Sequence, residues 1–438
     1  MAARHVVLVD SNRAGLRCLE RAHSLGHRVT FLYGSDIQHY KDDPESGRFM
    51  ALADRVVRIP STFTDEPVYG ALAQILRQEP IDALLCLLDE SVPAVAAAAT
   101  RLGLRFTARA AVDTAHDKLR CRKRLATCGV PTPAFAAVAS EAACREAVKR
   151  VGLPAVIKPR TCGSSHLVEI VQKDDEIAAY WRTLPVRSAA LHPSLKPLVG
   201  RGFLIEAHLA GPLMSAEVAV VHGKTTTFMI TGRRRGAESP ATEHGGFMPA
   251  PLDPDMKSAV ERYVERVVEA LGFDVGMAHV ELILTAAGPH LIEFNPRLMG
   301  GDLTRVYEAV AGRSIFDDLL AIHLDAPGPI PTPVCSGAAA CRKLVSAAPS
   351  TPRSDPWPRL GSRYGHALRV LANPLRPGAA IAPENVVGRF MVTANDAVAA
   401  ERLADEIAFQ FASETGIALH APESLAAALP PITALLTP

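Results

Sequence analysis

The sequence predicts a multidomain protein that combines the α/β and α+β fold classes, because three stretches of the chain differ in pattern. In residues 1–112, short apolar runs alternate with amphipathic segments, which indicates βαβ units and an open parallel sheet. A second α/β region begins near residue 155 and runs to about residue 330, and a proline-rich stretch at 326–333 forms the best candidate linker. Residues 331–438 contain strand-like segments and one helix at 396–411, which suffice for a small α+β lobe.

The first region has a Rossmann-like order of elements. Strands are expected at 5–10, 28–32, 56–59 and 83–88, with helices at 15–25 and 66–78. The turn after the first strand, at 11–15, lacks the Gly-x-Gly-x-x-Gly pattern that lets a backbone approach a pyrophosphate. Dinucleotide binding is therefore not expected at this turn.

Composition and charge narrow the classes of partner. The chain has 438 residues, with 47 Lys plus Arg against 46 Asp plus Glu, a net charge of +1. This balance argues against nucleic acid and anionic membranes, because both attract a basic excess. The 8 cysteines include no Cys-x-x-Cys pair, so neither zinc nor a disulfide framework is expected. No signal-peptide pattern and no membrane-length apolar run are visible, so we expect a soluble, cytoplasmic protein.

A basic helix is expected over residues 113–128, ended by Gly129 and Pro131. Lys118 lies in this helix among several arginines, and taken alone it is best interpreted as part of a solvated face.

Lys158 ends an apolar strand, and a flexible turn at Gly163, Ser164 and Ser165 follows it. A lysine held by a strand can present a fixed positive charge to phosphate oxygens. The turn offers backbone N–H groups and hydroxyls, and can close over a triphosphate as a lid. A surface lysine before a hairpin turn is the equally plausible alternative.

The strand expected at 203–209 can present its backbone to a flat heteroaromatic ring. Glu206 or Glu217 can then accept a hydrogen bond from a sugar hydroxyl. An ordinary strand with an exposed acid explains the pattern at least as well.

The strongest signal comes from two strands, at 279–284 and 291–297, joined by a short turn. Glu281, Glu293 and Asn295 share parity along these strands and are expected on one face. Two carboxylates and an amide oxygen form an all-oxygen site that suits Mg²⁺. Burying two acids on apolar strands without a cation is costly, so a purely structural role is disfavoured.

Basic and glycine-rich residues flank these strands. Arg297 follows the second strand at once and can neutralise a transferring phosphoryl group. The helix expected after residues 300–302 can add anion affinity through its N-terminus. The run at 233–235 consists of three arginines, which can meet an acidic substrate, although a solvated turn is the favoured interpretation.

In this order, the segments resemble the ATP-grasp superfamily over roughly residues 1–325. The segment at 291–302, LIEFNPRLMGGD, is particularly similar to the carboxylate–amine ligase branch, which includes bacterial L-amino-acid (dipeptide) ligases. Residues 388–417 are similar to the closing strand and helix of that branch. The resemblance implies a Rossmann-like domain at 1–112 before an ATP-grasp domain at 113–330. It also implies a lid subdomain at about 150–235 and a closing lobe at 331–438.

The resemblance also implies roles for individual residues. Catalytic roles would fall to Arg297, Lys158 and His244, metal binding to Glu281, Glu293 and Asn295, and ATP binding to Lys118, Lys158, Gly163, Ser164, Ser165, Glu206, Ala207, Leu209 and Glu217. His244 is included because the segment at 242–249 matches a polar segment near the acyl-phosphate site of relatives; a loop histidine without a role is the alternative. Leu213 stands where many relatives have a ribose-binding acid, so Glu217 or another group would take the ribose.

The implied reaction uses ATP and Mg²⁺, for which Mn²⁺ can substitute, to activate a small carboxylate as an acyl phosphate and join it to an amine. Glu90, at the end of a strand, is a candidate contact for the acid. The alternatives are a carboxylase, a carboxylate–thiol ligase and a nucleotide-binding module without catalytic activity. A homodimer is possible, and the substrates cannot be identified from the sequence.

Overall fold

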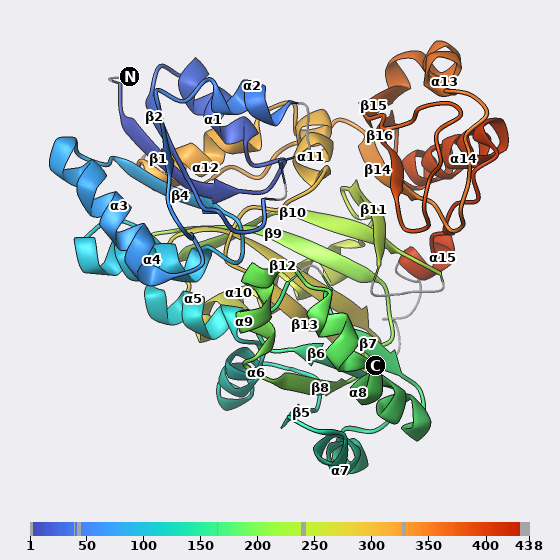
Figure 1. The fold of residues 1–438 in the computed structure, drawn as a ribbon, viewed down its shortest axis with the longest axis horizontal. Coiled ribbons are helices and arrows are strands. Elements are labelled where there is room, and N and C mark those ends of the chain that lie inside the picture. Colours follow the sequence, from blue (N-terminus) through green and yellow to red (C-terminus); the bar gives the residue numbers. More distant parts are fainter. Residues whose placement is uncertain are drawn as a thin grey trace.

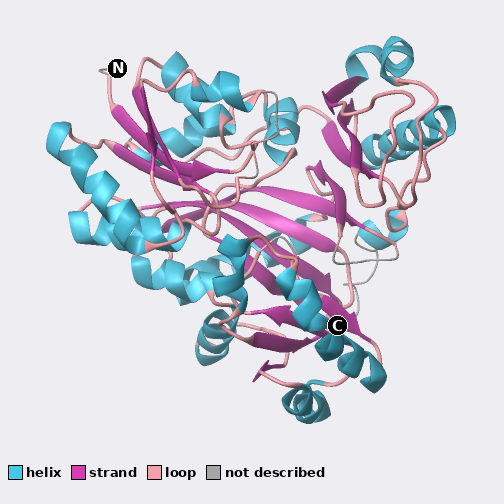
Figure 2. Cartoon of the chain, viewed as in Figure 1, coloured by secondary structure: helices cyan, strands magenta, loops and turns pink. Residues whose placement is uncertain are grey.

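The fold is described from a computed structural model, in which two four-stranded sheets lie beside a long eight-stranded sheet (Figures 1 and 2). The structure describes residues 3–38, 40–41, 45–163, 165–237, 242–325 and 330–429. Within them, no helix combines the length and the apolar character that a membrane crossing needs.

The first sheet has four parallel strands in the order β3-β2-β1-β4, which confirms the predicted open parallel sheet. Its strands are β1 (His5–Ser11), β2 (Arg28–Tyr33), β3 (Arg55–Arg58) and β4 (Ala83–Leu87), and its helices are α1 (Arg17–Ser24), α2 (Ser46–Met50), α3 (Asp65–Gln78) and α4 (Val92–Leu102). Every residue of β1 and β4 is buried, as expected for a parallel sheet with covered faces.

A small antiparallel sheet follows, in the order β5-β8-β6-β7. Its elements are β5 (Phe135–Val138), α7 (Glu141–Val151), β6 (Ala155–Pro159), β7 (Glu169–Val171), α8 (Asp174–Ala189), η1 (Pro193–Leu195), α9 (Lys196–Val199) and β8 (Phe203–Ala207). Strand β6 carries Lys158, and its neighbour β8 carries Glu206, which is directly opposite Val156, two residues before Lys158.

The largest sheet has eight strands in the order β13-β12-β9-β10-β11-β14-β16-β15. The strands are β9 (Leu213–Val221), β10 (Lys224–Arg235), β11 (Glu243–Met248), β12 (Gly276–Thr285), β13 (Gly288–Asn295), β14 (Ala338–Val345), β15 (Leu368–Ala372) and β16 (Val386–Ala394). Because β14 pairs with β11, one sheet continues from the middle of the chain into its last part. The domain boundaries expected near residues 112 and 330 stay a proposal.

The remaining helices cover this sheet and its edges. They are α10 (Pro254–Leu271), α11 (Leu303–Ala311), α12 (Ile315–His323), α13 (Trp357–Tyr364), η2 (Gly365–Ala367), α14 (Ala397–Thr415) and α15 (Leu425–Ala428). Helix α14 packs on β14 and β16, and these elements form the lobe at the upper right of Figure 1.

The single basic helix expected at 113–128 is two helices, α5 (Arg109–His116) and α6 (Lys118–Thr127). Asp117 separates them because its backbone is extended and its side chain accepts hydrogen bonds from two N–H groups at the start of α6. This break makes Lys118 the first residue of α6 and turns it towards the small sheet, where its N–H donates to the carbonyl of Arg160 at 2.9 Å.

The three arginines at 233–235 were expected in a solvated turn, and this expectation is wrong. They end strand β10, where Arg233 and Arg234 are buried. Only glycine fits at position 232 of this strand, because a Cβ there would lie 2.0 Å from the ring of Phe247. Alternation along β10 then sends Arg234 to one face of the sheet and its two neighbours to the other.

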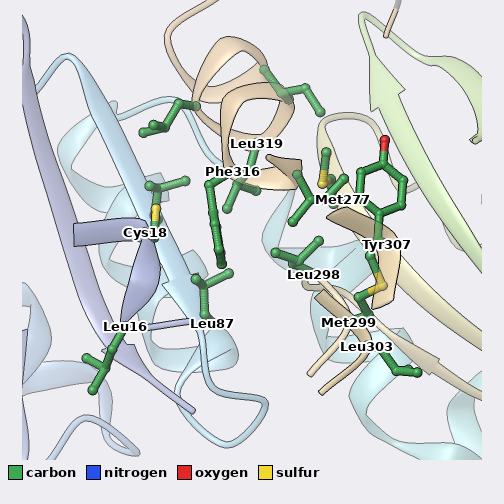
Figure 3. Close-up of a cluster of buried hydrophobic side chains, with 14 of the residues drawn as sticks. Leu16, Cys18, Leu87, Met277, Leu298, Met299, Leu303, Tyr307, Phe316 and Leu319 are labelled. Atoms are coloured by element: carbon green, nitrogen blue, oxygen red, sulfur yellow. The ribbon is translucent and has the colours of Figure 1, made fainter. Parts of the chain in front are cut away.

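A hydrophobic core joins the first sheet to α11 and α12 (Figure 3). Figure 3 shows Phe316 of α12 between the side chains of Cys18 and Leu87 and those that surround Leu298. Leu298 and Met299, which are both 2% exposed, follow Arg297 directly. The core therefore fixes the backbone on which Arg297 is presented.

Candidate active site

Two cavities adjoin between the small sheet, the large sheet and the carboxyl end of the first sheet. The apolar cavity, about 160 Å³, lies between β6–β8 and β12–β13, and Val156, Ile170, Ile283 and Ile292 are in its wall. The charged cavity, about 330 Å³, extends from β12–β13 to β14 and β16. Residues that line both cavities are Ser165, Leu213, Arg235, Glu281 and Glu293.

Aliphatic side chains from two sheets form the wall of the apolar cavity. Val156 and Ile170 come from the small sheet, while Ile283 and Ile292 come from the large sheet. Ala207 and Leu209, expected at the nucleotide, line this cavity together with His208. The four aliphatic residues could have been identified from the sequence, because side chains alternate between the two faces along the strands β6, β7, β12 and β13.

A buried charge cluster closes one end of the apolar cavity. The carboxylate of Glu206 lies 2.6 Å from the ammonium of Lys158 and also accepts a hydrogen bond from Nε of Arg122 at 2.6 Å. Burial opposes the ionisation of Glu206, but the charges of Arg122 and Lys158 outweigh it and lower its pKa to about 2. Burial also lowers the pKa of Lys158, against the opposing charge of Glu206. Glu206 thus holds Lys158 in place at the cavity wall.

The three expected metal ligands lie together, as the strand parity predicted. Glu281 and Glu293 are directly opposite one another on β12 and β13, and both line the two cavities. Asn295 donates through its Nδ2 to the carbonyl of His279, which leaves its Oδ1 as an acceptor at the charged cavity. The ammonium of Lys118 lies 2.6 Å from Glu293 and donates to the carbonyl of Cys162.

This donor set fits Mg²⁺. Among the described residues, no group of three or more His, Cys, Asp or Glu side chains is arranged to hold a metal. Two carboxylates and an amide oxygen suit a cation that completes its shell with water and phosphate oxygens. Burial opposes the ionisation of Glu281, but a hydrogen bond from His279 and the charge of Arg233 lower its pKa to about 2, so the ligand is a carboxylate.

Glu217 lies beneath this set rather than at a ribose. It is 1% exposed, lines neither cavity, and accepts hydrogen bonds from Ser215 and Thr231. Nδ1 of His279 lies 2.9 Å from it. Burial alone would lower the pKa of His279, but the charge of Glu217 raises it to about 9. The expected ribose contact does not suit this position; Glu217 instead holds the ring of His279, whose Nε2 lies 3.3 Å from Glu281 and 2.9 Å from Nη1 of Arg233.

Arg297 lines the charged cavity and forms an ion pair with Asp89, just beyond the end of β4. Glu90, the residue named from the sequence, does not line this cavity; Asp89 does. Burial and the neighbouring Asp89 raise the pKa of Glu90 to about 7. A Cβ on Gly163 would lie 3.7 Å from Oε1 of Glu90, so this acid packs at the start of the lid turn.

The lid turn borders both cavities. Gly163 lines the charged cavity, and Ser165 lines both. Ser164 lies outside the described residues.

His244, expected to have a catalytic role, does not line the charged cavity. It is 4% exposed, and its ring centroid is 6.4 Å from that of His420. Burial lowers its pKa to about 4, so the ring is neutral. Its neighbours Glu243 and Gly245 line the charged cavity instead, because side chains alternate along a strand.

The last lobe was expected to close the protein, but none of its residues at the charged cavity was named from the sequence. Cys341 and Lys343 of β14 and Arg389 of β16 line it. Asp302, just before α11, accepts hydrogen bonds from Arg389 at 3.3 Å and from Arg13 at 2.9 Å. The cavity is therefore bounded by residues from the first, middle and last parts of the chain.

Family models match the chain in two places: an ATP-grasp N-terminal domain over residues 19–105 and an ATP-grasp domain over residues 151–306. The carbamoyl phosphate synthase large chain of Methanospirillum hungatei is 25% identical over 289 residues, 62% of this chain and 25% of that protein. Carnosine synthase 1 of Mus musculus is 27% identical over 249 residues, 54% of this chain and 30% of that protein. The chain thus spans less than a third of these curated relatives.

A solved structure is similar along nearly the whole chain. An L-amino acid ligase from Bacillus licheniformis superposes with a TM-score of 0.76 at 20% identity, covering 96% of this chain and 99% of that one. At this identity the likeness shows the fold. With both ATP-grasp models in the predicted order on this fold, the chain belongs to the ATP-grasp superfamily.

Proposed function

We propose that this protein is an ATP- and Mg²⁺-dependent ligase that activates a carboxylate as an acyl phosphate and joins it to an amine. The observation that carries the proposal is the position of Glu281 and Glu293, which line both cavities. A nucleotide whose base lies in the apolar cavity would direct its phosphates to these acids. A substrate in the charged cavity would meet the γ-phosphate at the same point.

The cation would be held by Glu281, Glu293 and Asn295. Mg²⁺ bound there would offset the charge of the phosphate oxygens. Lys158 and Arg297 would stabilise charge on the transferring phosphoryl group, and Lys118 would exchange its contact with Glu293 for a phosphate oxygen. The lid turn from Gly163 to Ser165 would close over the phosphates and exclude water from the acyl phosphate.

The reaction has two steps. First, a carboxylate oxygen attacks the γ-phosphorus of ATP, and the bond to the ADP oxygen breaks. Second, the neutral amine attacks the acyl carbon, phosphate leaves, and the nitrogen loses a proton to give the amide. The products are the amide, ADP and phosphate.

Amino acids are the proposed substrates. Cationic and anionic side chains both line the charged cavity, among them Arg233, Arg389, Glu243 and Asp302, so a zwitterion can be paired at both ends. The names of the L-amino acid ligase and of carnosine synthase support the same class. A thiol acceptor or bicarbonate would instead make the protein a thioester-forming ligase or a carboxylase.

The experiment is a screen of L-amino-acid pairs, and of β-alanine with each L-amino acid, for ADP and phosphate release with Mg²⁺. Mass spectrometry identifies the products, and bicarbonate and thiols serve as competing acceptors. The variant Glu293→Gln should lower kcat by about 100-fold or more with the active pair, because it removes a charged metal ligand. Glu265→Gln, an exposed position on α10, is the matched control and should keep wild-type kcat. Unchanged turnover in Glu293→Gln would contradict the proposal. Cytoplasmic location, a homodimer and the use of Mn²⁺ stay predictions.

A further inference from the structure

Lysine and arginine side chains line the charged cavity, and all but one of these are already paired with acids. The pairs are Arg233 with Glu243, Arg235 with Glu423, Arg297 with Asp89, and Arg389 with Asp302. Lys343 is different: its ammonium forms no hydrogen bond or ion pair with any residue that the structure describes. Its charge at the cavity is therefore uncompensated by a direct contact.

The register between β14 and β16 makes the charge of Lys343 more unfavourable. Lys343 on β14 is directly opposite Arg389 on β16, and both side chains line the charged cavity. Like charges at directly opposed positions destabilise an antiparallel pair. Asp302 lies near Arg389 at 3.3 Å, but it is shared with Arg13. A lysine that served only solubility has no reason to lie at this position, whereas an anion bound between the two cations would remove the repulsion.

Burial supports the same interpretation. Lys343 is only half-exposed, and burial lowers the pKa of its ammonium, against the opposing charges of Glu243 and Asp302. A half-buried ammonium without a partner has lost hydration that a bound anion can replace with a charge-assisted hydrogen bond.

We propose that Lys343 and Arg389 bind a substrate carboxylate that is not the one activated, and that this group is the free carboxylate of the amino acid supplying the amine. The inference rests on the proposed ligase function. It assigns the last lobe as the part of the protein that recognises the acceptor.

The position of the pair favours the acceptor as the source of this carboxylate. Four strand-to-strand steps separate β12, which carries Glu281, from β14, a distance of about 19 Å along the sheet. Even with long side chains reaching inward from both ends, a carboxylate held by Lys343 lies several ångströms from the reacting acyl group. The acid activated at Glu281 and Glu293 fills the near end, so the molecule that approaches from the far end carries the amine.

The test is a double-mutant cycle between protein and substrate. Wild type and Lys343→Met are compared on the acceptor amino acid found in the screen and on its carboxamide, for example alanine and alaninamide. Wild type should show a KM about 10- to 100-fold higher for the carboxamide, because a charged contact is lost. Lys343→Met should raise KM for the amino acid by the same factor and leave KM for the carboxamide and for ATP unchanged. A purely structural lysine would not remove this discrimination.

Further variants and substrates complete the experiment. Lys343→Arg keeps the charge and should restore most of the discrimination, and Lys224→Met, on an exposed part of β10, should match wild type. Equal effects of Lys343→Met on both acceptors, or no discrimination by wild type, would overturn the inference. Donor acids are varied in parallel, aspartate against asparagine and glutamate against glutamine. Discrimination that appears only among donors would overturn the assignment to the acceptor. If no pair of substrates releases ADP in wild type, the proposed function itself is wrong. That result is distinct from a failure of the inference about Lys343, which requires an active wild type.

Discussion

Two adjacent residues of β14 show how basic side chains serve different purposes on the two faces of one strand. Arg342 is 2% exposed and donates hydrogen bonds to Glu401 at 2.7 and 2.8 Å and to Asp405 at 2.9 Å. Arg234 of β10 joins them, and these four residues are called the closed cluster. Lys343 has no such partner and faces the cavity beside Arg389; these two are called the open pair.

The difference lies in how far each charge is compensated. In the closed cluster, two arginines and two carboxylates balance one another and attach α14 to the sheet. In the open pair, only Arg389 contacts a carboxylate, that of Asp302, which it shares with Arg13, so that positive charge remains available. Buried charge that is fully paired maintains structure, while charge left over at a cavity is available to a ligand.

The largest expected loss of stability comes from Glu401→Gln, which disrupts the closed cluster. Glu401 is 0% exposed and contacts both arginines, so its neutralisation leaves buried positive charge without compensation. The free energy of unfolding should fall by about 3–5 kcal/mol. Urea unfolding followed by circular dichroism measures the change. Glu406→Gln on the same helix, at an exposed position, should change stability by less than about 0.5 kcal/mol. Equal losses in the two variants would show that the cluster is not the origin of the effect.

A third buried charge, the carboxylate of Asp10, extends the comparison to the effect of pH on stability. Asp10 is 0% exposed and accepts hydrogen bonds from Thr62 and from the N–H of Ser11, and burial raises its pKa to about 6. A raised pKa means that the protonated form is favoured in the folded state, so its stabilisation is lost as pH rises from about 4 to about 6.

The corresponding measurement compares wild type with Asp10→Asn. Relative to this variant, wild type should lose about 3 kcal/mol of unfolding free energy between pH 4 and pH 7, since one pKa unit corresponds to about 1.4 kcal/mol. Denaturant titrations at several pH values provide the numbers. A stability difference that stays constant over this range would mean that Asp10 does not titrate there.

The open pair should be the least important for stability. Lys343→Met removes a like-charge contact and leaves no acid unpaired, so the free energy of unfolding should change by less than about 0.5 kcal/mol, in either direction. The same urea experiment applies, with Arg342→Met as the contrasting change one residue away. A loss as large as that of Arg342→Met would mean that Lys343 belongs to the structural framework.

Local patterns predicted how the candidate metal ligands are placed relative to one another. The parity of Glu281, Glu293 and Asn295 is a property of two neighbouring strands joined by a short turn, so the sequence alone defines their common face. Lys158 is similar, because the strand that carries it is one short apolar run. The parallel sheet followed for the same reason, from alternating segments whose order along the chain resembles their order in space.

The rest depends on contacts between distant parts of the chain. His244 and Glu217 were assigned from resemblance, but the face on which each lies depends on the register of β11 and β9 within the long sheet. Lys343 and Arg389 reach the cavity only because β14 pairs with β11 and β16 pairs with β14. No local pattern encodes such pairing, so the charged cavity could not be assembled from the sequence.

Asp302 has a consequence for the order in which the protein becomes active during synthesis. Its carboxylate contacts Arg13, near the beginning of the chain, and Arg389, which is made long after it. A growing chain that ends before β16 already contains the apolar cavity and the metal carboxylates, yet it lacks one wall of the charged cavity. Such an intermediate has the residues proposed for ATP but not those proposed for the acceptor. Late synthesis of the last lobe therefore delays assembly of the charged cavity until the wall that contains Arg389 is present.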